Sequence, residues 1–130
     1  RGVDSSASPE EALKIGRALH AQCGAAVCIS GETDYTIGRD GVTRGRNGHA
    51  MMTRVTGLGC TASALCGAFA AVVSDPAVAA AAAMAVLGIA GEIAATRAIG
   101  PGTLQVHLLD ALYLLNAGDI ERYLKIETES

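Results

Sequence analysis

The chain has 130 residues, half of them hydrophobic, and a formal net charge of −3 at neutral pH. That length and composition are sufficient for one globular domain with a core of its own. The ten lysines and arginines are scattered along the sequence, so they predict no basic surface that would follow a nucleic-acid backbone. We therefore expect no nucleic-acid partner.

The cysteines indicate a cellular compartment. Cys23, Cys28, Cys60 and Cys66 show no Cys-x-x-Cys spacing and no matching pair of histidines, which argues against a zinc site and against a secreted disulfide framework. A reducing, cytoplasmic location fits this pattern best. The sequence opens on Arg-Gly-Val-Asp without an initiator methionine or a charged-then-apolar leader, so we expect it to begin within a longer protein.

The apolar stretch from residue 60 to residue 91 raises the alternative of a membrane hairpin. The sequence Ser-Asp-Pro at 74–76 divides it into two uncharged runs of about 15 residues, whereas about 20 are needed to cross a bilayer. Alanine, which is frequent in both runs, is only weakly lipophilic. We therefore favour two buried helices, packed closely through their alanines, and no membrane contact.

The first elements predict an α/β protein. Ser8 can cap a helix, Pro9 suits its first position, and Glu11 stands three residues after the cap. Small and apolar residues then recur at helical spacing, so we predict a helix that ends near Gly24. Residues 25–29 are wholly apolar, which is typical of a short strand buried on both faces of a parallel sheet. A helix that leads into a buried strand indicates the α/β class.

A hairpin and a second helix are predicted next. Residues 35–39 and 42–46 flank Asp40-Gly41, which favours a two-residue turn in an antiparallel ribbon at the edge of the sheet. A short segment at 51–55 then leads into a glycine-rich turn. After that turn we predict a helix from about residue 59 to residue 73.

Two further helices complete the prediction. Asp75 and Pro76 form a cap followed by a first helical residue, and this helix should run to Arg97, whose charge favours the C-terminal end of a helix. Thr103 is expected to cap the last helix, and the polar tail after Asn116 is expected to fray. The last helix should present one stripe of leucines, at Leu104, Leu108, Leu112 and Leu115.

The glycine-rich turn at 56–60, with the sequence Thr-Gly-Leu-Gly-Cys, is the strongest candidate for chemistry. A turn with two glycines before a helix presents unpaired backbone N–H groups and the positive end of the helix dipole to one point. Gly57 and Gly59 would let a ligand approach the backbone, and the amides of Leu58, Gly59 and Cys60 could converge on an oxyanion. The turn matches neither the P-loop nor the dinucleotide fingerprint, so the spacing alone indicates only an anion site.

The residues around this turn form a longer pattern. Val-Thr-Gly-Leu-Gly-Cys at 55–60 is preceded by Asn-Gly-His at 47–49 and Met-Thr-Arg at 52–54. Together they resemble the hydroxyethylthiazole kinase family, thiamine-salvage members of the ribokinase-like group. Further segments resemble that family in the right order, so the likeness covers nearly the whole chain: residues 2–5, 30–35, 100–102 and 109–112.

The resemblance implies a three-layer α/β ribokinase-like fold, in which residues 1–130 form the C-terminal half of one kinase domain, with a sheet flanked by helices and a β-hairpin. It implies transfer of the γ-phosphate of ATP, with Mg2+, to the hydroxyl of 4-methyl-5-(2-hydroxyethyl)thiazole. Members of the family form homotrimers with active sites between subunits. The N-terminal half would supply the first strands and an acidic motif for Mg2+, so we assign no metal ligand here and expect this chain alone to be inactive.

The resemblance also assigns roles within the turn. In the wider ribokinase-like group the turn ends in an aspartate that takes the proton of the substrate hydroxyl, and Cys60 stands at that position. The amides of Leu58, Gly59 and Cys60 would stabilise the transferring phosphoryl group, Gly57 would contact the thiazole alcohol, and Ser30 and Gly59 would contact ATP. Since an ordinary thiol is a poor base at neutral pH and phosphoryl transfer depends chiefly on positioning and charge, we rank the anion hole above the base.

Two departures from the family pattern keep alternatives open. Leu58 replaces a more frequent threonine and Ala50 a frequent proline, so neither the substrate nor the rate can be assumed. One alternative is a ribokinase-like kinase for another small alcohol, a pyrimidine or a sugar, although the cysteine at position 60 argues against it. The other is a noncatalytic nucleotide-binding or assembly module.

The remaining candidate side chains receive structural interpretations. The three histidines are assigned to surface or capping roles, and the other three cysteines to small buried hydrophobes. Glu32 and Asp34 stand near a metal-bound triphosphate in the predicted arrangement, but we expect both to be solvated. Met51 and Met52 are expected to fill core space.

Overall fold

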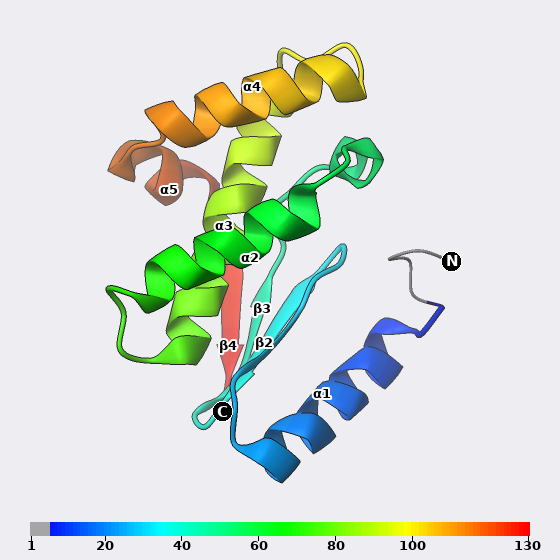
Figure 1. Ribbon diagram of the computed structural model, residues 1–130, viewed down its shortest axis with the longest axis vertical. Coiled ribbons are helices and arrows are strands. Elements are labelled where there is room, and N and C mark those ends of the chain that lie inside the picture. The colour runs from blue at the N-terminus through cyan, green and yellow to red at the C-terminus, as the bar shows by residue number, and fades with distance from the viewer. Residues whose placement is uncertain (1–5) are drawn as a thin grey trace.

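A computed structural model describes residues 6–130 of the chain (Figure 1). Residues 2–5, which belong to the family pattern above, lie outside the described part. In chain order the elements are α1 (Pro9–Cys23), β1 (Val27–Ile29), β2 (Asp34–Gly38), β3 (Gly41–Gly45), the 3-10 helix η1 (Ala50–Arg54), α2 (Leu58–Ala70), α3 (Pro76–Ala95), α4 (Pro101–Leu114), α5 (Ala117–Tyr123) and β4 (Ile126–Glu129).

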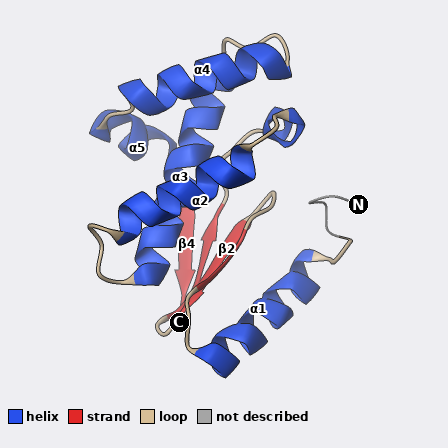
Figure 2. Cartoon of the chain, in the orientation of Figure 1, coloured by secondary structure: helices blue, strands red, loops and turns tan. Residues whose placement is uncertain are grey.

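The four described strands form one sheet in the order β1-β2-β3-β4, and each neighbouring pair is antiparallel. Helix α1 covers one face of this sheet, and α3 covers the other, with α2, α4 and α5 packed around it (Figures 1 and 2). The side chains alternate between these two faces. A Cβ at Gly16 of α1 would meet the Ile37 and Ile29 side chains, whereas a Cβ at Gly38 would meet Ala77 of α3. The result is the three-layer α/β arrangement that we predicted.

Helix α1 begins and ends where the sequence predicts. The Ser8 hydroxyl accepts the Glu11 backbone N–H at 3.2 Å, and the Glu11 carboxylate accepts the Ser8 N–H at 2.9 Å, which satisfies two helix-start donors reciprocally. Gly24 ends the helix with a φ of +72°, a conformation that glycine adopts without a Cβ penalty.

The prediction of a buried parallel strand at 25–29 was wrong in this structure. Strand β1 covers only Val27–Ile29, pairs antiparallel with β2, and contains no fully buried residue. It is an edge strand of the described sheet, and it contacts α1 on one face and α3 on the other without being fully buried on either. Apolar runs of this length do not distinguish the two kinds of strand.

The hairpin prediction is confirmed in its two strands and wrong in its position within the sheet. Gly38 pairs with Gly41, so Arg39 and Asp40 make the two-residue turn, one residue earlier than expected. Strands β2 and β3 are the two inner strands of the sheet, because β4 pairs with the other side of β3. The ribbon is therefore not at an edge.

The prediction that the tail after Asn116 frays was also wrong. The Asn116 side chain accepts the Asp119 N–H at 3.0 Å and so caps α5, and β4 then returns along β3. Two ion pairs join the returning strand to β3 and the residue that follows it: Arg44 with Glu129, and Arg46 with Glu127 at 2.9 Å. A polar segment is thus held by backbone pairing and charge rather than by apolar burial.

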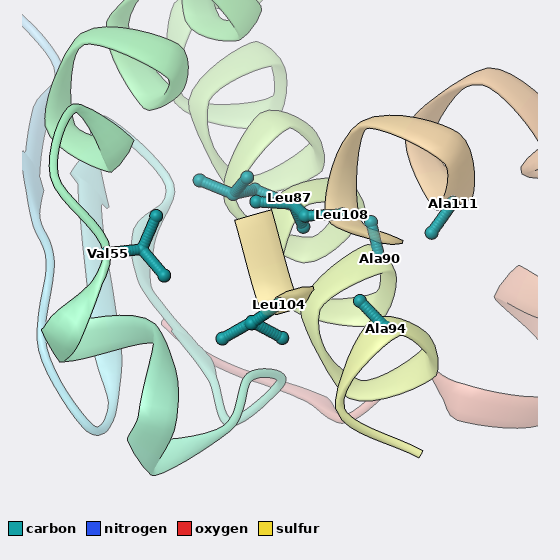
Figure 3. Packing of buried hydrophobic residues seen from close by; sticks show 7 residues of the cluster. All are labelled: Val55, Leu87, Ala90, Ala94, Leu104, Leu108 and Ala111. Atoms are coloured by element: carbon teal, nitrogen blue, oxygen red, sulfur yellow. The ribbon is translucent and has the colours of Figure 1, made fainter. Parts of the chain in front are cut away.

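The hydrophobic core lies between α3, α4 and the turn that precedes α2 (Figure 3). Its buried members are Val55, Leu87, Ala90, Ala94, Leu104, Leu108 and Ala111. The prediction of two buried helices holds for α3 alone. Helix α2 packs on α3 but contains no fully buried residue, because it forms the outer layer. By length and composition α3 could cross a membrane, but more than half of its apolar window is buried inside the protein.

Helix α4 starts three residues earlier than predicted. Pro101 is its first residue, and Thr103 lies inside the first turn, where its hydroxyl accepts the N–H groups of Ile99 and Gly100. The predicted cap is therefore a residue of the capping box and not the residue before the helix. Of the predicted leucine stripe, Leu104 and Leu108 are buried against α3.

Candidate functional site

A hollow with a volume of about 960 Å³ lies where loops from the sheet meet the start of α2. Three segments line it: the loop before β2, the loop between β3 and η1 with η1 itself, and the first turns of α2. A part of α3 forms its floor. Its lining residues are Ser30, Gly31, Glu32, Thr33, Asp34, Arg46, Asn47, Gly48, His49, Ala50, Met52, Thr53, Leu58, Gly59, Ala62, Met84, Leu87 and Gly88.

The glycine-rich turn forms the N-terminus of α2 with the geometry that an anion site needs. Gly57 is the residue before the helix, has a φ of +89°, and provides no side-chain cap. Leu58, Gly59 and Cys60 are the first three helical residues, and Thr61 is the first whose N–H bonds back to the turn, at 3.0 Å to Gly57. The three preceding amides therefore have no partner within the helix and carry the positive end of its dipole.

The space next to Gly57 and Gly59 is open. A Cβ placed on Gly57 or Gly59 would meet no atom within 4 Å. For Gly57 the positive φ is the reason for glycine, whereas Gly59 lies in a helix where other residues would also fit. The absence of a Cβ at Gly59 thus leaves room for a ligand rather than for packing.

The loop before β2 brings a buried carboxylate to the opposite side of the hollow. Asp34 is only 8% exposed, and its Oδ1 accepts the Gly31 N–H at 3.0 Å. Burial raises the pKa of the Asp34 carboxyl to about 6, and the hydrogen bond from Gly31 opposes that rise. The expectation that Asp34 is solvated was therefore wrong, because β2 is an inner strand and α3 covers the face on which Asp34 lies.

One wall of the hollow is formed by Arg46, Asn47 and Gly48, which connect β3 to η1. The Arg46 side chain is half exposed and brings a cation to the rim, where it pairs with Glu127. Asn47 is 7% exposed, and its backbone lies so close to Gly88 of α3 that a Cβ on Gly88 would be 2.6 Å from the Asn47 carbonyl. The wall therefore rests directly on α3.

The segment between this wall and the glycine turn is the 3-10 helix η1. His49 caps it, because its Nδ1 accepts the Met51 N–H at 3.1 Å. Met52 reaches back to α3, where a Cβ on Gly91 would lie 2.2 Å from its sulfur. The predicted capping role of His49 and the predicted core role of Met52 are both confirmed.

Comparison with known proteins identifies the family. The model of the hydroxyethylthiazole kinase family matches residues 1–118. This chain belongs to the hydroxyethylthiazole kinase family. A family member from Syntrophus aciditrophicus is 60% identical over 126 residues, which are 97% of this chain and 47% of that protein. One from Leptospira biflexa serovar Patoc is 52% identical over 124 residues, 95% of this chain and 46% of that protein.

A solved structure supports the same fold. The hydroxyethylthiazole kinase protein from Pyrococcus horikoshii OT3 superposes with a TM-score of 0.88 at 36% sequence identity. The superposition covers 93% of this chain and 47% of that one. The chain thus spans about half the length of the curated relatives and of the solved family member that it matches.

The structure brings together some of the residues that the sequence assigned to the site. Ser30, Leu58 and Gly59 line the same hollow, although Ser30 stands far from the other two in the sequence. Gly57 and Cys60 flank the lining residues without being among them, and Cys60 is exposed. The turn and the loop before β2 therefore meet, while the cysteine lies beside the hollow.

Sequence reasoning missed the buried amide of Asn47 and the burial of Asp34. The signal for Asn47 was available only as part of the Asn-Gly-His pattern, since nothing local marks a buried amide. The expectation for the other cysteines was wrong as well: Cys23 and Cys28 are exposed and Cys66 is half-buried. Cys23 occupies the last turn of α1, and Cys28 the edge strand.

The described residues contain no group of three or more His, Cys, Asp or Glu side chains that could hold a metal ion. Two carboxylates, Glu32 and Asp34, do line the hollow. Mg2+ is commonly held by one or two protein carboxylates together with substrate phosphates and water. The donors present in residues 6–130 therefore fit a magnesium ion that arrives with a polyphosphate, not one held by a protein cage.

Proposed function

We propose that this chain is the C-terminal half of a kinase that transfers the γ-phosphate of ATP to the hydroxyl of 4-methyl-5-(2-hydroxyethyl)thiazole, a step of thiamine salvage. The main observation behind this proposal is that the N-terminus of α2 has no side-chain cap and opens into the same hollow as the Ser30 loop. Family membership, with relatives named hydroxyethylthiazole kinase, supports this choice of substrate and reaction.

The chemistry rests on the first amides of α2. Negative charge builds on the oxygens of the transferring phosphoryl group, and fixed N–H donors at that position stabilise the transition state without reorganising. Leu58, Gly59 and Cys60 supply three such donors on a rigid helix, and the helix dipole adds to their effect. Ser30 and Gly59 would contact ATP, and Gly57 the thiazole alcohol.

Cys60 has the secondary role in this proposal. It stands at the position of the ribokinase-like general base, but its side chain is exposed and does not line the hollow. A loose transition state needs little help from a base, because the bond to the leaving group is largely broken before the nucleophile's proton is lost. The amide cradle would therefore contribute more to the rate than the thiol.

Magnesium would neutralise charge on the ATP phosphates when it is bound. Within residues 6–130, Asp34 and Glu32 are the carboxylates that line the hollow, and an acidic motif in the N-terminal half would complete the set. We also propose that the full-length protein is a cytoplasmic homotrimer. Supporting this, α4 carries exposed apolar side chains that a subunit contact would cover: Val106, Leu109, Tyr113 and Leu114.

Three variants of the full-length protein test the proposed mechanism. Gly59→Val should lower kcat by at least about 100-fold, because the valine would occupy the space of the phosphoryl group. The fold should tolerate it, since a Cβ at this position meets no atom within 4 Å. Cys60→Ala should keep about a tenth of kcat or more. Cys60→Asp tests directly whether an acid in that place restores or improves the rate.

The opposite ranking, with Cys60→Ala nearly inactive and Gly59→Val active, would make the thiol the central group and overturn the amide mechanism. A panel of alcohol acceptors tests the substrate, and a strong preference for a sugar or a pyrimidine would refute the thiazole assignment. Nucleotide binding without turnover, insensitive to changes at Gly57 and Gly59, would indicate a noncatalytic module. Thiazole phosphorylation by the 130-residue chain alone would refute the proposal that it is half of a domain.

A further inference from the structure

The wall of the hollow formed by Arg46 and Asn47 is attached to the C-terminal segment of the chain, residues 123–127. The Arg46 N–H donates to the Lys125 carbonyl at 2.9 Å, and the Lys125 N–H donates to Asn47 Oδ1 at 2.8 Å. Asn47 Nδ2 donates to the Tyr123 carbonyl at 2.7 Å. Arg46 and Asn47 line the hollow, and both are therefore bonded to a segment that does not line it.

The Asn47 carboxamide is the centre of this arrangement. Besides Tyr123 and Lys125 it bonds to α3, because Nδ2 also donates to Glu92 Oε2 at 2.9 Å. Its oxygen and both of its amide hydrogens thus have partners, and the residue is only 7% exposed. A buried polar group with every bond made holds its surroundings in one arrangement, since breaking any bond leaves a desolvated group unpaired.

The whole anchoring segment lies beyond the part of the chain that the family model matches. The match ends at residue 118, whereas Tyr123, Lys125 and Glu127 follow it. The segment adds two charge pairs around Asn47, from Glu127 to Arg46 and from Lys125 to Glu92. The wall is consequently held by α3 on one side and by the C-terminal segment on the other.

We infer that Asn47 is a positioning residue for the kinase site: its carboxamide locks the wall that carries Arg46 to α3 and to residues 123–125. This inference rests on the proposed function for its kinetic consequence. Asn47 touches no reacting atom in this account. It sets the position of Arg46 and of the backbone that leads through η1 to the glycine turn. Loss of its hydrogen bonds therefore lowers the fraction of molecules in which the wall is positioned for binding.

The test uses the full-length protein and four variants. Asn47→Ser removes the bonds to Tyr123 and Glu92 without burying a charge. Asn47→Asp keeps an acceptor for the Lys125 N–H but sets its second oxygen against the Tyr123 carbonyl and the Glu92 carboxylate. Glu92→Gln is combined with Asn47→Asp as a rescue, because the glutamine amide can donate to the aspartate. Glu121→Gln is the matched control, since the exposed Glu121 side chain lies beside the anchoring segment and forms no hydrogen bond or ion pair with the wall.

Both Asn47 variants should raise the KM for ATP by about 10-fold or more, with a smaller change in kcat, because the lost arrangement serves ground-state binding. Adding Glu92→Gln should recover part of the affinity in the Asn47→Asp background, while Glu121→Gln should leave KM unchanged. A folded Asn47→Ser enzyme with KM and kcat within about twofold of the wild type would overturn the inference, even if it unfolds more easily.

Amide hydrogen exchange separates this inference from the proposed function. In Asn47→Ser the amides of residues 46–50 should exchange at least about 10-fold faster, while those of α4 keep their protection. If the wild-type protein phosphorylates no thiazole alcohol, the proposed function fails, and the exchange result still decides whether Asn47 locks the wall. Unchanged exchange at residues 46–50 would refute the locking role whatever the activity.

Discussion

Replacing Asp34 by asparagine removes a carboxyl group that the fold buries at the edge of the hollow. The side chain is 8% exposed, accepts the Gly31 N–H, and forms no ion pair within residues 6–130. Burial raises the pKa of this carboxyl from 3.8 to about 6. Asparagine keeps an oxygen for the Gly31 N–H but cannot ionise, so the substitution isolates the free-energy cost of the buried charge.

The sign and size of the effect follow from proton linkage. Between pH 4 and pH 6 the folded chain binds more protons at Asp34 than the unfolded chain, so stability falls as pH rises through this range. A difference of about two pKa units corresponds to about 3 kcal/mol of unfolding free energy. Above about pH 7 the loss is complete, and below about pH 3 it is absent.

Urea unfolding of the wild-type and Asp34→Asn chains at pH 4, 5, 6, 7 and 8 measures this difference. We expect the stability of the variant relative to the wild type to increase by about 3 kcal/mol between pH 4 and pH 8. The new amide hydrogens add a cost that does not depend on pH, so only the change with pH is compared. Asp40→Asn, in the exposed hairpin turn, is the control that should show no such increase. A relative stability that stays constant with pH would refute the reasoning.

Three further predictions concern the packing around the site and are checked by urea unfolding at one pH. Leu104→Ala, at a fully buried position, should cost about 2–5 kcal/mol, whereas Gln105→Ala, at an exposed position of the same helix, should change stability by about 0.5 kcal/mol or less. Equal losses would contradict the assigned core. Gly88→Ala should cost about 1–3 kcal/mol, because its methyl group would lie 2.6 Å from the Asn47 backbone, and a neutral result would mean that the wall does not rest on α3. Ser8→Ala should cost about 1 kcal/mol through the lost cap, and no loss would show that α1 does not depend on it.

Features governed by neighbouring residues could be predicted from the sequence. The caps of α1 and α3, at Ser8 and Asp75, depend on side chains that reach backbone groups two or three residues away. The hairpin of β2 and β3 depends on a short turn between two strand-forming segments. The uncapped start of α2 depends on a glycine turn followed at once by a helix. In each case the interacting groups are adjacent in the chain, so the local pattern contains the information.

Other predictions failed because the deciding partner lies far away in the sequence. Residues 25–29 were predicted to form a strand buried on both faces of a parallel sheet. In the described sheet, β1 pairs only with β2, and that pairing is antiparallel. The polar tail was predicted to fray, yet it forms β4, which pairs with β3 more than 80 residues before it. Local composition cannot reveal a strand partner at that separation, because backbone pairing is nearly independent of the side chains that take part.

By itself, then, the sequence determined helices α1 to α4, the hairpin and the glycine turn of this family member, since those features depend on contacts within a few residues. Only the tertiary structure decided which residues meet at the site. It placed Ser30 in the same hollow as Gly59, buried the carboxylate of Asp34, and tied Asn47 to the C-terminal segment. Burial and long-range hydrogen bonds come from the packing of the whole chain, and no local pattern encodes them.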